Sequence, residues 1–184
     1  DEELTRVRSR LTMRRNPLYV EHADVPLVLD GQEMLLESVM IDGHLLGADA
    51  YSVDDDTLTI HSLPKAVDEN GAVFILECVT QIKPQDNTSL DKSKKMFCTQ
   101  CEAEGFRKIT YYLDRPDVMS KFTTCVVADE ARYPLLLSNG NAIERGKEEG
   151  GRHFVKWEDP FRKPCYLFAL VAGDLVCVED HFKT

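Results

Sequence analysis

The sequence predicts an all-β protein, built as a single antiparallel β-sandwich domain that takes in residues 1–184. Turn-forming clusters of Gly, Pro, Asn and Asp recur about every eight to twelve residues, which is typical of β-sandwiches and barrels. Between them, short segments alternate apolar and polar side chains with the period of two that a half-buried strand requires. The sequence contains no amphipathic helix of ordinary length, internal repeat or linker.

The first expected strand, residues 7–13, has a basic outer face. Val7, Ser9, Leu11 and Met13 are expected to face one way, and Arg6, Arg8, Arg10 and Arg14 the other. Since side chains of a strand alternate between its two faces, we expect Arg6, Arg8 and Arg10 to be exposed. Such a row could bind an anion, but a protected sheet surface is the preferred interpretation.

Turn signals separate the strands that follow. Asp30-Gly31 and Asp42-Gly43 are typical of hairpins, whereas the three aspartates at 54–56 match a calcium loop poorly and predict a turn. The longest strand has an expected apolar face of Phe74, Leu76, Cys78, Thr80 and Ile82. The expected strands are 7–13, 25–29, 34–41, 44–47, 51–53, 58–60, 72–82, 122–128, 135–137, 153–157 and 165–171.

The last third of the chain carries more detailed expectations. One helical turn is expected at 118–121, a hairpin turn at 138–141 and a polar, glycine-rich loop at 144–151. The continuous apolar run 165–171 predicts a strand buried on both faces, and a second apolar stretch follows at 175–178. The expected core residues here are Trp157, Leu167, Ala169 and Val171.

Composition bears on partners and location. The formal net charge of −10 argues against nucleic acid or an anionic membrane surface as a partner. The longest apolar run, 165–173, is too short to span a bilayer. The chain starts without the features of a signal peptide, and its six cysteines lack the pattern of a small secreted domain. A cytoplasmic location is therefore expected.

The segment 98–117 holds the densest run of chemically capable side chains. Gln100, Glu102 and Glu104 stand at every second position, so an extended 98–104 would place all three on one face. Such a row of acceptors could receive a cation, a metal or an amine. The alternative interpretation is a solvated acidic edge.

Complete catalytic constellations are missing from the 184 residues. Cys98 and Cys101 form a Cys-x-x-Cys pair, but a redox site of this kind needs a βαβ context and a structural zinc site needs four ligands. Glu102 and Glu104 are adjacent in one segment, unlike the carboxylates that flank a glycosidase cleft. The sequence has neither His-Glu-x-x-His nor Gly-x-Ser-x-Gly. We therefore expect neither a catalytic residue nor a metal site in this chain.

Several long blocks resemble the N-terminal domain of the zinc-dependent aminopeptidase N family, in its soluble alanyl-aminopeptidase branch. The blocks are Cys98-Thr-Gln-Cys-Glu-Ala-Glu-Gly-Phe-Arg107, Ile109-Thr-Tyr-Tyr-Leu-Asp-Arg-Pro-Asp117, Tyr133-Pro-Leu-Leu-Leu-Ser-Asn-Gly140, Gly151-Arg-His153 and the run 159–174. The resemblance implies a saddle-like β-sandwich that precedes a catalytic zinc domain outside this chain. It also implies that the parent enzyme removes N-terminal amino acids from peptides.

The resemblance assigns two residues a role in substrate binding. Carried over from the family, Glu102 binds the free α-amino group of the peptide and Gln100 lines the pocket for its first side chain. The implied partners are peptide N-termini and the catalytic domain of the same polypeptide, which holds the zinc. The segment alone should be inactive. The alternative function is a non-catalytic β-sandwich interaction module.

Overall fold

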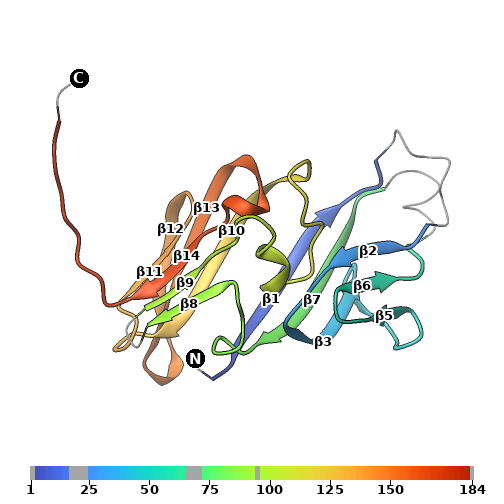
Figure 1. The fold of residues 1–184 in the computed structure, drawn as a ribbon, viewed down its shortest axis with the longest axis horizontal. Helices are drawn as coiled ribbons and strands as arrows, with labels where there is room; N and C mark the ends of the chain where they lie inside the picture. The colour runs from blue at the N-terminus through green and yellow to red at the C-terminus, as the bar shows by residue number, and fades with distance from the viewer. Residues whose placement is uncertain (1–2, 17–24, 65–71, 94–95, 183–184) are drawn as a thin grey trace.

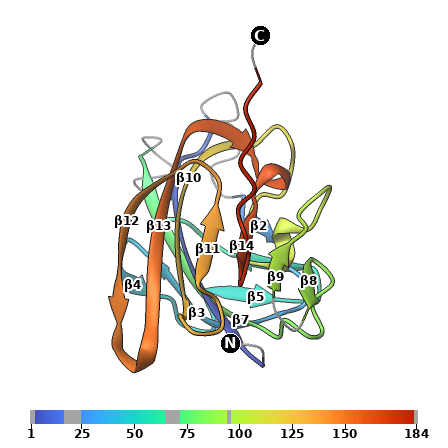
Figure 2. The same ribbon diagram turned by 90° about the vertical axis from the view of Figure 1, so that its left-hand side faces the viewer.

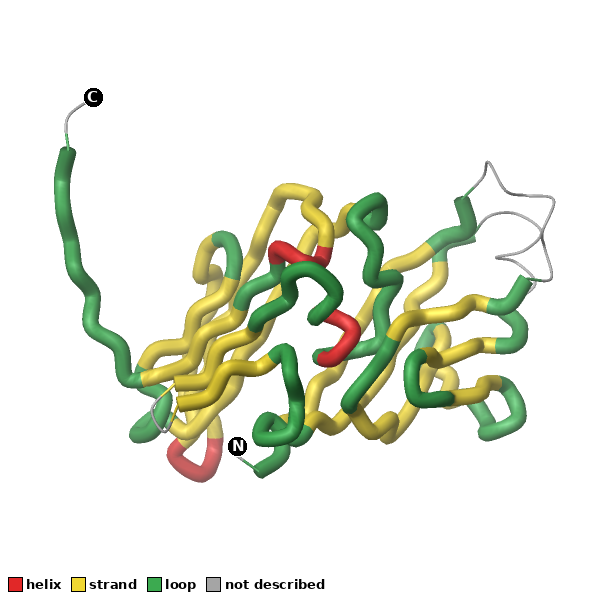
Figure 3. The backbone as a smooth tube through the Cα atoms, viewed as in Figure 1, coloured by secondary structure: helices red, strands yellow, loops and turns green. Residues whose placement is uncertain are grey.

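The computed structural model describes residues 3–16, 25–64, 72–93 and 96–182, and these fold as antiparallel β-structure (Figure 1). The prediction of an all-β fold is confirmed, since helix is limited to short 3₁₀ turns among the described residues (Figure 3). The strands are β1 (Thr5–Met13), β2 (Leu27–Asp30), β3 (Met34–Ile41), β4 (His44–Leu45), β5 (Tyr51–Val53), β6 (Thr57–Ile60), β7 (Phe74–Ile82), β8 (Leu90–Ser93), β9 (Met96–Thr99), β10 (Met119–Asp129), β11 (Leu135–Ser138), β12 (Asn141–Glu148), β13 (Arg152–Pro164) and β14 (Leu170–Gly173). The 3₁₀ turns are η2 (Phe106–Lys108), η3 (Glu149–Gly151) and η4 (Cys165–Leu167).

The strands form two packed halves along the long axis of the molecule (Figure 1). In one half, sheet β1-β7-β3-β4 packs on sheet β2-β6-β5. In the other, sheet β10-β13-β12 packs on sheet β11-β14-β9-β8 (Figure 2). A third apolar cluster joins the halves, because Phe106, Tyr112 and Phe168 in it pack against Leu11 of β1 and Phe122 of β10. The segment that follows β9 thus lies at the junction of the two halves.

Strands β1 and β7 follow the predicted period of two. In β1, Arg6, Arg8 and Arg10 are exposed, as expected, and alternate with partly buried residues. Nε of Arg6 donates a hydrogen bond of 2.7 Å to Glu37 of β3, so part of the basic face is balanced by acids of the same sheet. The predicted apolar face of β7 is confirmed, since all five of its side chains are buried. β7 is the central strand of the sheet, between β1 and β3.

The predicted hairpin at Asp42-Gly43 is confirmed, but the one at Asp30-Gly31 is wrong. β3 pairs with β4, whereas β2 pairs with β6, far along the chain. Gly31 serves a close approach instead: a Cβ there would lie 2.1 Å from the Tyr111 ring. The backbone N–H of Asp30 donates to the carbonyl of Tyr112 at 2.8 Å, so a long-range contact accounts for this glycine.

Two further expectations on the chain after residue 135 are wrong. The signal at 138–141 does not pair its flanking strands, since β11 pairs with β14 and β12 pairs with β13. The polar residues 144–151 form most of β12 and the turn η3 instead of a loop. β12 is an edge strand exposed on both faces, and such a strand has the composition of a loop.

The apolar run 165–171 is not the doubly buried strand that its composition predicts. It turns as η4 at Cys165–Leu167 before β14 begins, so Leu167 is 50 % exposed and Ala169 is also exposed. Within the run the buried side chains are Cys165 and Phe168, because the 3₁₀ turn changes which side chains face inward. Trp157 and Val171 are half-buried, so the prediction that they are core residues is only partly confirmed.

One remaining expectation also needs correction. Residues 118–121 are not a helical turn, because β10 begins at Met119. The stretch 175–178 is outside the core: Val176 is 91 % exposed, and residues 174–182 run away from the sheets (Figure 1). Among the described residues, no helix has the length and apolar character to cross a membrane.

Candidate functional site

The site candidates lie on a tight turn at the junction of the two halves, which we call the 100–108 turn after its residues. The chain leaves β9 at Thr99, and the backbone N–H of Gly105 donates to the carbonyl of Cys101 at 2.9 Å. η2 follows at once, with the N–H of Lys108 donating to the carbonyl of Gly105. The extended conformation considered for 98–104 therefore ends at Thr99. The reason is that Cys101 is buried in the junction cluster, which draws the chain inward.

The turn nevertheless brings the three predicted acceptors together. Gln100, Glu102 and Glu104 all line one polar hollow of about 300 Å³. All three residues are exposed, and the peptide bond between Glu102 and Ala103 is cis. The other lining residues are Gln32, Thr88, Ser89, Gly105 and Lys108.

Buried aromatic packing fixes the far end of the turn. The ring of Phe106 meets those of Tyr112 and Phe168 edge-on, at centroid distances of 5.0 and 5.1 Å. Edge-to-face pairs of this kind add to the free energy of apolar burial. The acceptors of the 100–108 turn therefore project from a rigid base.

The charge of Arg107 on the turn is balanced by the buried carboxylate of Asp114. Its Nε donates to Oδ2 of Asp114 at 2.9 Å, and the Asp114 side chain is only 1 % exposed. Burial alone would lower the pKa of Arg107, but the hydrogen bond and charge of Asp114 raise it instead. Oε1 of Glu104 lies 3.7 Å from Nη2 of the same guanidinium.

Lys108 is neutralised in the same way, by Glu33. Its Nζ donates to Oε1 of Glu33 at 2.9 Å, and the backbone N–H of Thr88 donates to the other carboxylate oxygen at 2.7 Å. Burial opposes the charged form of Glu33, but the hydrogen bonds from Lys108 and Thr88 outweigh it and lower the pKa of Glu33. Both cations beside the hollow are thus paired.

Glu102 differs from its neighbours. Within the part of the chain that the structure describes, no group donates a hydrogen bond to its carboxylate or forms an ion pair with it. An exposed carboxylate without an internal partner can receive a cation or a protonated amine. Its position on a rigid turn would give that ligand a defined orientation.

The cysteines of the Cys-x-x-Cys pair are poorly suited to metal or redox chemistry. Burial raises the pKa of the Cys101 thiol to about 12, so it stays protonated near neutral pH. Among the described residues, no group of three or more His, Cys, Asp or Glu side chains is arranged to hold a metal ion.

Sequence reasoning missed the residues that support the turn. Glu33 comes from a segment far from the turn in sequence, whereas Asn87 and Ser89 belong to the stretch 83–90, which has plain loop composition. An Asn-Thr-Ser run in a loop gives no local signal of a supporting role, because the bond from Asn87 to Lys108 depends on the tertiary fold.

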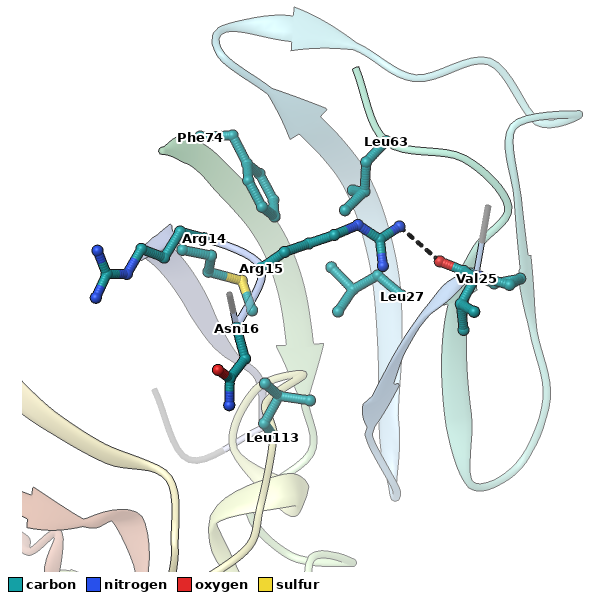
Figure 4. A pocket seen from close by; sticks show the side chains of 10 residues that line it. Arg14, Arg15, Asn16, Val25, Leu27, Leu63, Phe74 and Leu113 are labelled. Atoms are coloured by element: carbon teal, nitrogen blue, oxygen red, sulfur yellow. Dashed lines mark hydrogen bonds between the residues drawn. The ribbon is translucent and has the colours of Figure 1, made fainter. Parts of the chain in front are cut away.

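A second hollow of about 340 Å³ lies beside strands β1, β2 and β7 (Figure 4). Its lining is mainly apolar and includes Leu27, Phe74 and Leu113. Arg15 extends across it, and its Nη2 donates to the carbonyl of Val25 at 2.8 Å. The two hollows share no residue, so this one is separate from the candidate site.

Gly105 offers a direct test of how tightly the 100–108 turn is packed. Gly105 has a φ of −93°, which suits any residue, but a Cβ there would lie 2.4 Å from the carbonyl oxygen of Gln100. Gly105→Ala should therefore cost about 1–3 kcal/mol in the free energy of unfolding, measured by urea denaturation. The control is Gly47→Ala, whose new Cβ meets only the flexible side chain of Asp49 and should be neutral. Equal effects of the two changes would contradict tight packing of the turn.

The structure is thus a β-sandwich domain with an exposed carboxylate, that of Glu102, on a polar hollow at its junction. The family model of the peptidase M1 N-terminal domain matches residues 73–167, and the chain belongs to this family. The matched range contains the whole 100–108 turn.

Named relatives agree with this family. The chain is 48 % identical to aminopeptidase N of Escherichia coli (strain K12) over 165 residues, which are 88 % of this chain and 18 % of that protein. It is also 48 % identical to aminopeptidase N of Caulobacter vibrioides over 183 residues, 98 % of this chain and 20 % of that protein. The chain thus spans about a fifth of the length of these relatives.

A solved structure of Legionella pneumophila aminopeptidase A in complex with aspartic acid has the same fold. It superposes with a TM-score of 0.85 at 35 % identity, covering 93 % of this chain and 20 % of that chain. An M1 zinc metallopeptidase from Deinococcus radiodurans, at 16 % identity and a TM-score of 0.77, shares the fold alone.

Proposed function

We propose that this chain is the N-terminal domain of a zinc-dependent aminopeptidase, in which Glu102 binds the α-ammonium group of a peptide and Gln100 lines the pocket for its first side chain. The observation that carries the proposal is the Glu102 carboxylate, which lines a polar hollow without a partner among the described residues. The aminopeptidase relatives support the activity of the parent.

The chemistry of an exopeptidase suits such a group. The enzyme must act one residue from a charged end, and only the free N-terminus of a peptide carries an ammonium. A fixed carboxylate pairs with that ammonium through charge-assisted hydrogen bonds. Because the bond to be cleaved lies at a set distance from the ammonium, this contact orients the substrate, and orientation alone can contribute several orders of magnitude to rate.

Zinc and the catalytic groups belong to a part of the parent outside this chain. The sequence has no His-Glu-x-x-His motif, and proteins of the same fold include M1 zinc metallopeptidases from Deinococcus radiodurans. Bound zinc would polarise the scissile carbonyl and activate water. The contribution of this chain is to bind and orient the peptide end, with the catalytic domain of the same polypeptide as its partner.

The location of the parent in the cytoplasm is also part of the proposal. The support is the set of free cysteines, of which Cys78, Cys101 and Cys165 are buried and unbridged. Fractionation of cells followed by detection of the parent tests it.

The function is tested by comparing the parent with the isolated chain. The parent should hold zinc and hydrolyse aminoacyl-p-nitroanilides, and it should lose this activity when the substrate amine is acetylated. The isolated chain should do neither, because it lacks the zinc ligand set. One tightly bound zinc per isolated chain would overturn the assignment of the metal and point back to Cys98 and Cys101. Equal hydrolysis of acetylated substrates by the parent would overturn the amine contact.

A further inference from the structure

We infer that Asn87 is a positioning residue, which holds the 100–108 turn in the shape that presents Glu102. The inference rests on the proposed function of Glu102 as the amine contact. Asn87 is not among the lining residues of the hollow, and within the described residues its side chain hydrogen-bonds to neither Gln100 nor Glu102. It would act only through the backbone of the turn.

The amide of Asn87 joins the two ends of the turn. Its Nδ2 donates to the carbonyl of Lys108 at 2.6 Å, at the end of η2. Its Oδ1 accepts from the backbone N–H of Ser89 at 3.0 Å, and the carbonyl of Ser89 accepts from the N–H of Gln100 at 2.7 Å. One side chain therefore fixes the start and the finish of the segment that carries Glu102.

We call the two hydrogen bonds of the Asn87 amide the Asn87 clasp, and the burial of Asn87 makes this clasp hard to replace. Asn87 is 3 % exposed, so water cannot readily take over either hydrogen bond. Within the described residues, the same two segments are also linked by Nζ of Lys108, which donates directly to Oγ1 of Thr88, and by Glu33, which contacts both Thr88 and Lys108. These links are made by partly exposed side chains, so they are weaker than the buried clasp.

Asn87→Asp changes the clasp with little change of shape. A carboxylate oxygen replaces the NH₂ group, so the bond to the carbonyl of Lys108 is lost and two acceptors face each other. The end of the turn should then move away from Asn87. Since Glu102 lies within the turn, its carboxylate loses its defined position.

The chain offers a matched control in Asn139. Its Nδ2 donates to the carbonyl of Leu167 at 3.0 Å, and its Oδ1 accepts from the N–H of Ala169 at 2.7 Å. This clasp also joins two backbone segments, but it is more exposed than that of Asn87, and among the described residues it reaches the 100–108 turn only through the ring of Phe168. Asn139→Asp therefore reports the general cost of such a change.

The experiment measures how well the full-length parent recognises an amine. Calorimetry gives the Kd of two ligands, alanine hydroxamate and propionohydroxamate, which differ only by the amino group. The ratio of the Kd of propionohydroxamate to the Kd of alanine hydroxamate isolates the amine contact. A lower folded fraction changes the binding stoichiometry but not this ratio. The variants are Asn87→Asp, Asn139→Asp and Glu102→Gln, with Asn87→Ser as a second clasp variant that keeps the residue polar.

The expected result is a ratio that falls about tenfold in both Asn87 variants, because a misplaced anchor loses most of its effect. The ratio should also fall in Glu102→Gln and stay at the wild-type value in Asn139→Asp. A wild-type ratio in both Asn87 variants, with the loss in Glu102→Gln retained, overturns the role of Asn87 and leaves the proposed function standing. A wild-type ratio in Glu102→Gln overturns both.

Discussion

In the full-length parent enzyme, Glu102→Gln should lower kcat/KM for peptides by about one to two orders of magnitude. The change keeps the shape of the side chain but removes the charge that pairs with the α-ammonium. A hydrogen bond to a charged group is worth roughly 1.5–3 kcal/mol, and each 1.4 kcal/mol or so corresponds to a factor of ten. Steady-state kinetics on a dipeptide with a free amino end measures this loss.

Glu104→Gln is the matched control for this prediction. Both side chains are exposed and line the same hollow, but Oε1 of Glu104 lies 3.7 Å from Nη2 of Arg107, which already offsets its charge. We therefore expect a smaller effect on kcat/KM. If Glu102 were structural instead, its variant would have a lower Tm and an unchanged kcat/KM per folded molecule. A stable Glu102→Gln enzyme with wild-type kinetics would show that the amine assignment is wrong.

The largest effect on stability is expected for Asp114→Ala. The Asp114 carboxylate accepts from Nε of Arg107 at 2.9 Å and from the thiol of Cys165 at 2.9 Å, with its side chain 1 % exposed. Its removal leaves the guanidinium of Arg107 without its closest counter-charge in a largely buried place. Losing one partner of a buried ion pair typically costs about 3–5 kcal/mol in the free energy of unfolding. Urea denaturation of the chain measures the loss.

Asp117→Ala provides the comparison, because Asp117 forms an ion pair of similar length on the surface. Its Oδ2 lies 3.1 Å from Nη2 of Arg115, and both side chains are mostly exposed. Water screens such a pair, so its loss should cost less than about 1 kcal/mol. Similar losses for the two variants would contradict the view that Asp114 is a buried hub at the junction of the two halves.

The local pattern of the sequence was enough to predict much of the strand content. Alternation alone gave β1 with its exposed arginines and β7 with its buried face, because each side chain of a strand points to the side opposite its neighbours. The Asp42-Gly43 hairpin was predicted correctly for a similar reason, since the two residues fix the turn by themselves. The residue types of the candidate site were also visible, in Gln100, Glu102 and Glu104.

The tertiary structure decided the places where one segment has several possible partners. Asp30-Gly31 resembles a hairpin turn, yet Gly31 is there to make room for the ring of Tyr111. The run 165–171 is apolar throughout, so nothing in its composition reveals that η4 turns Leu167 outward. β12 is polar on both faces and becomes a strand only because β13 supplies its hydrogen bonds.

The candidate site shows the same division between what the local sequence predicts and what the tertiary structure decides. Its sequence determined which acceptors are present, whereas burial of Cys101 and the clasp of Asn87 determined that they stand on a turn and not along a strand. Alternation and turn chemistry are properties of neighbouring residues and can be read from the chain. Which distant residues bury a segment or satisfy its backbone hydrogen bonds depends on the packing of the whole domain, so only the tertiary structure decides it.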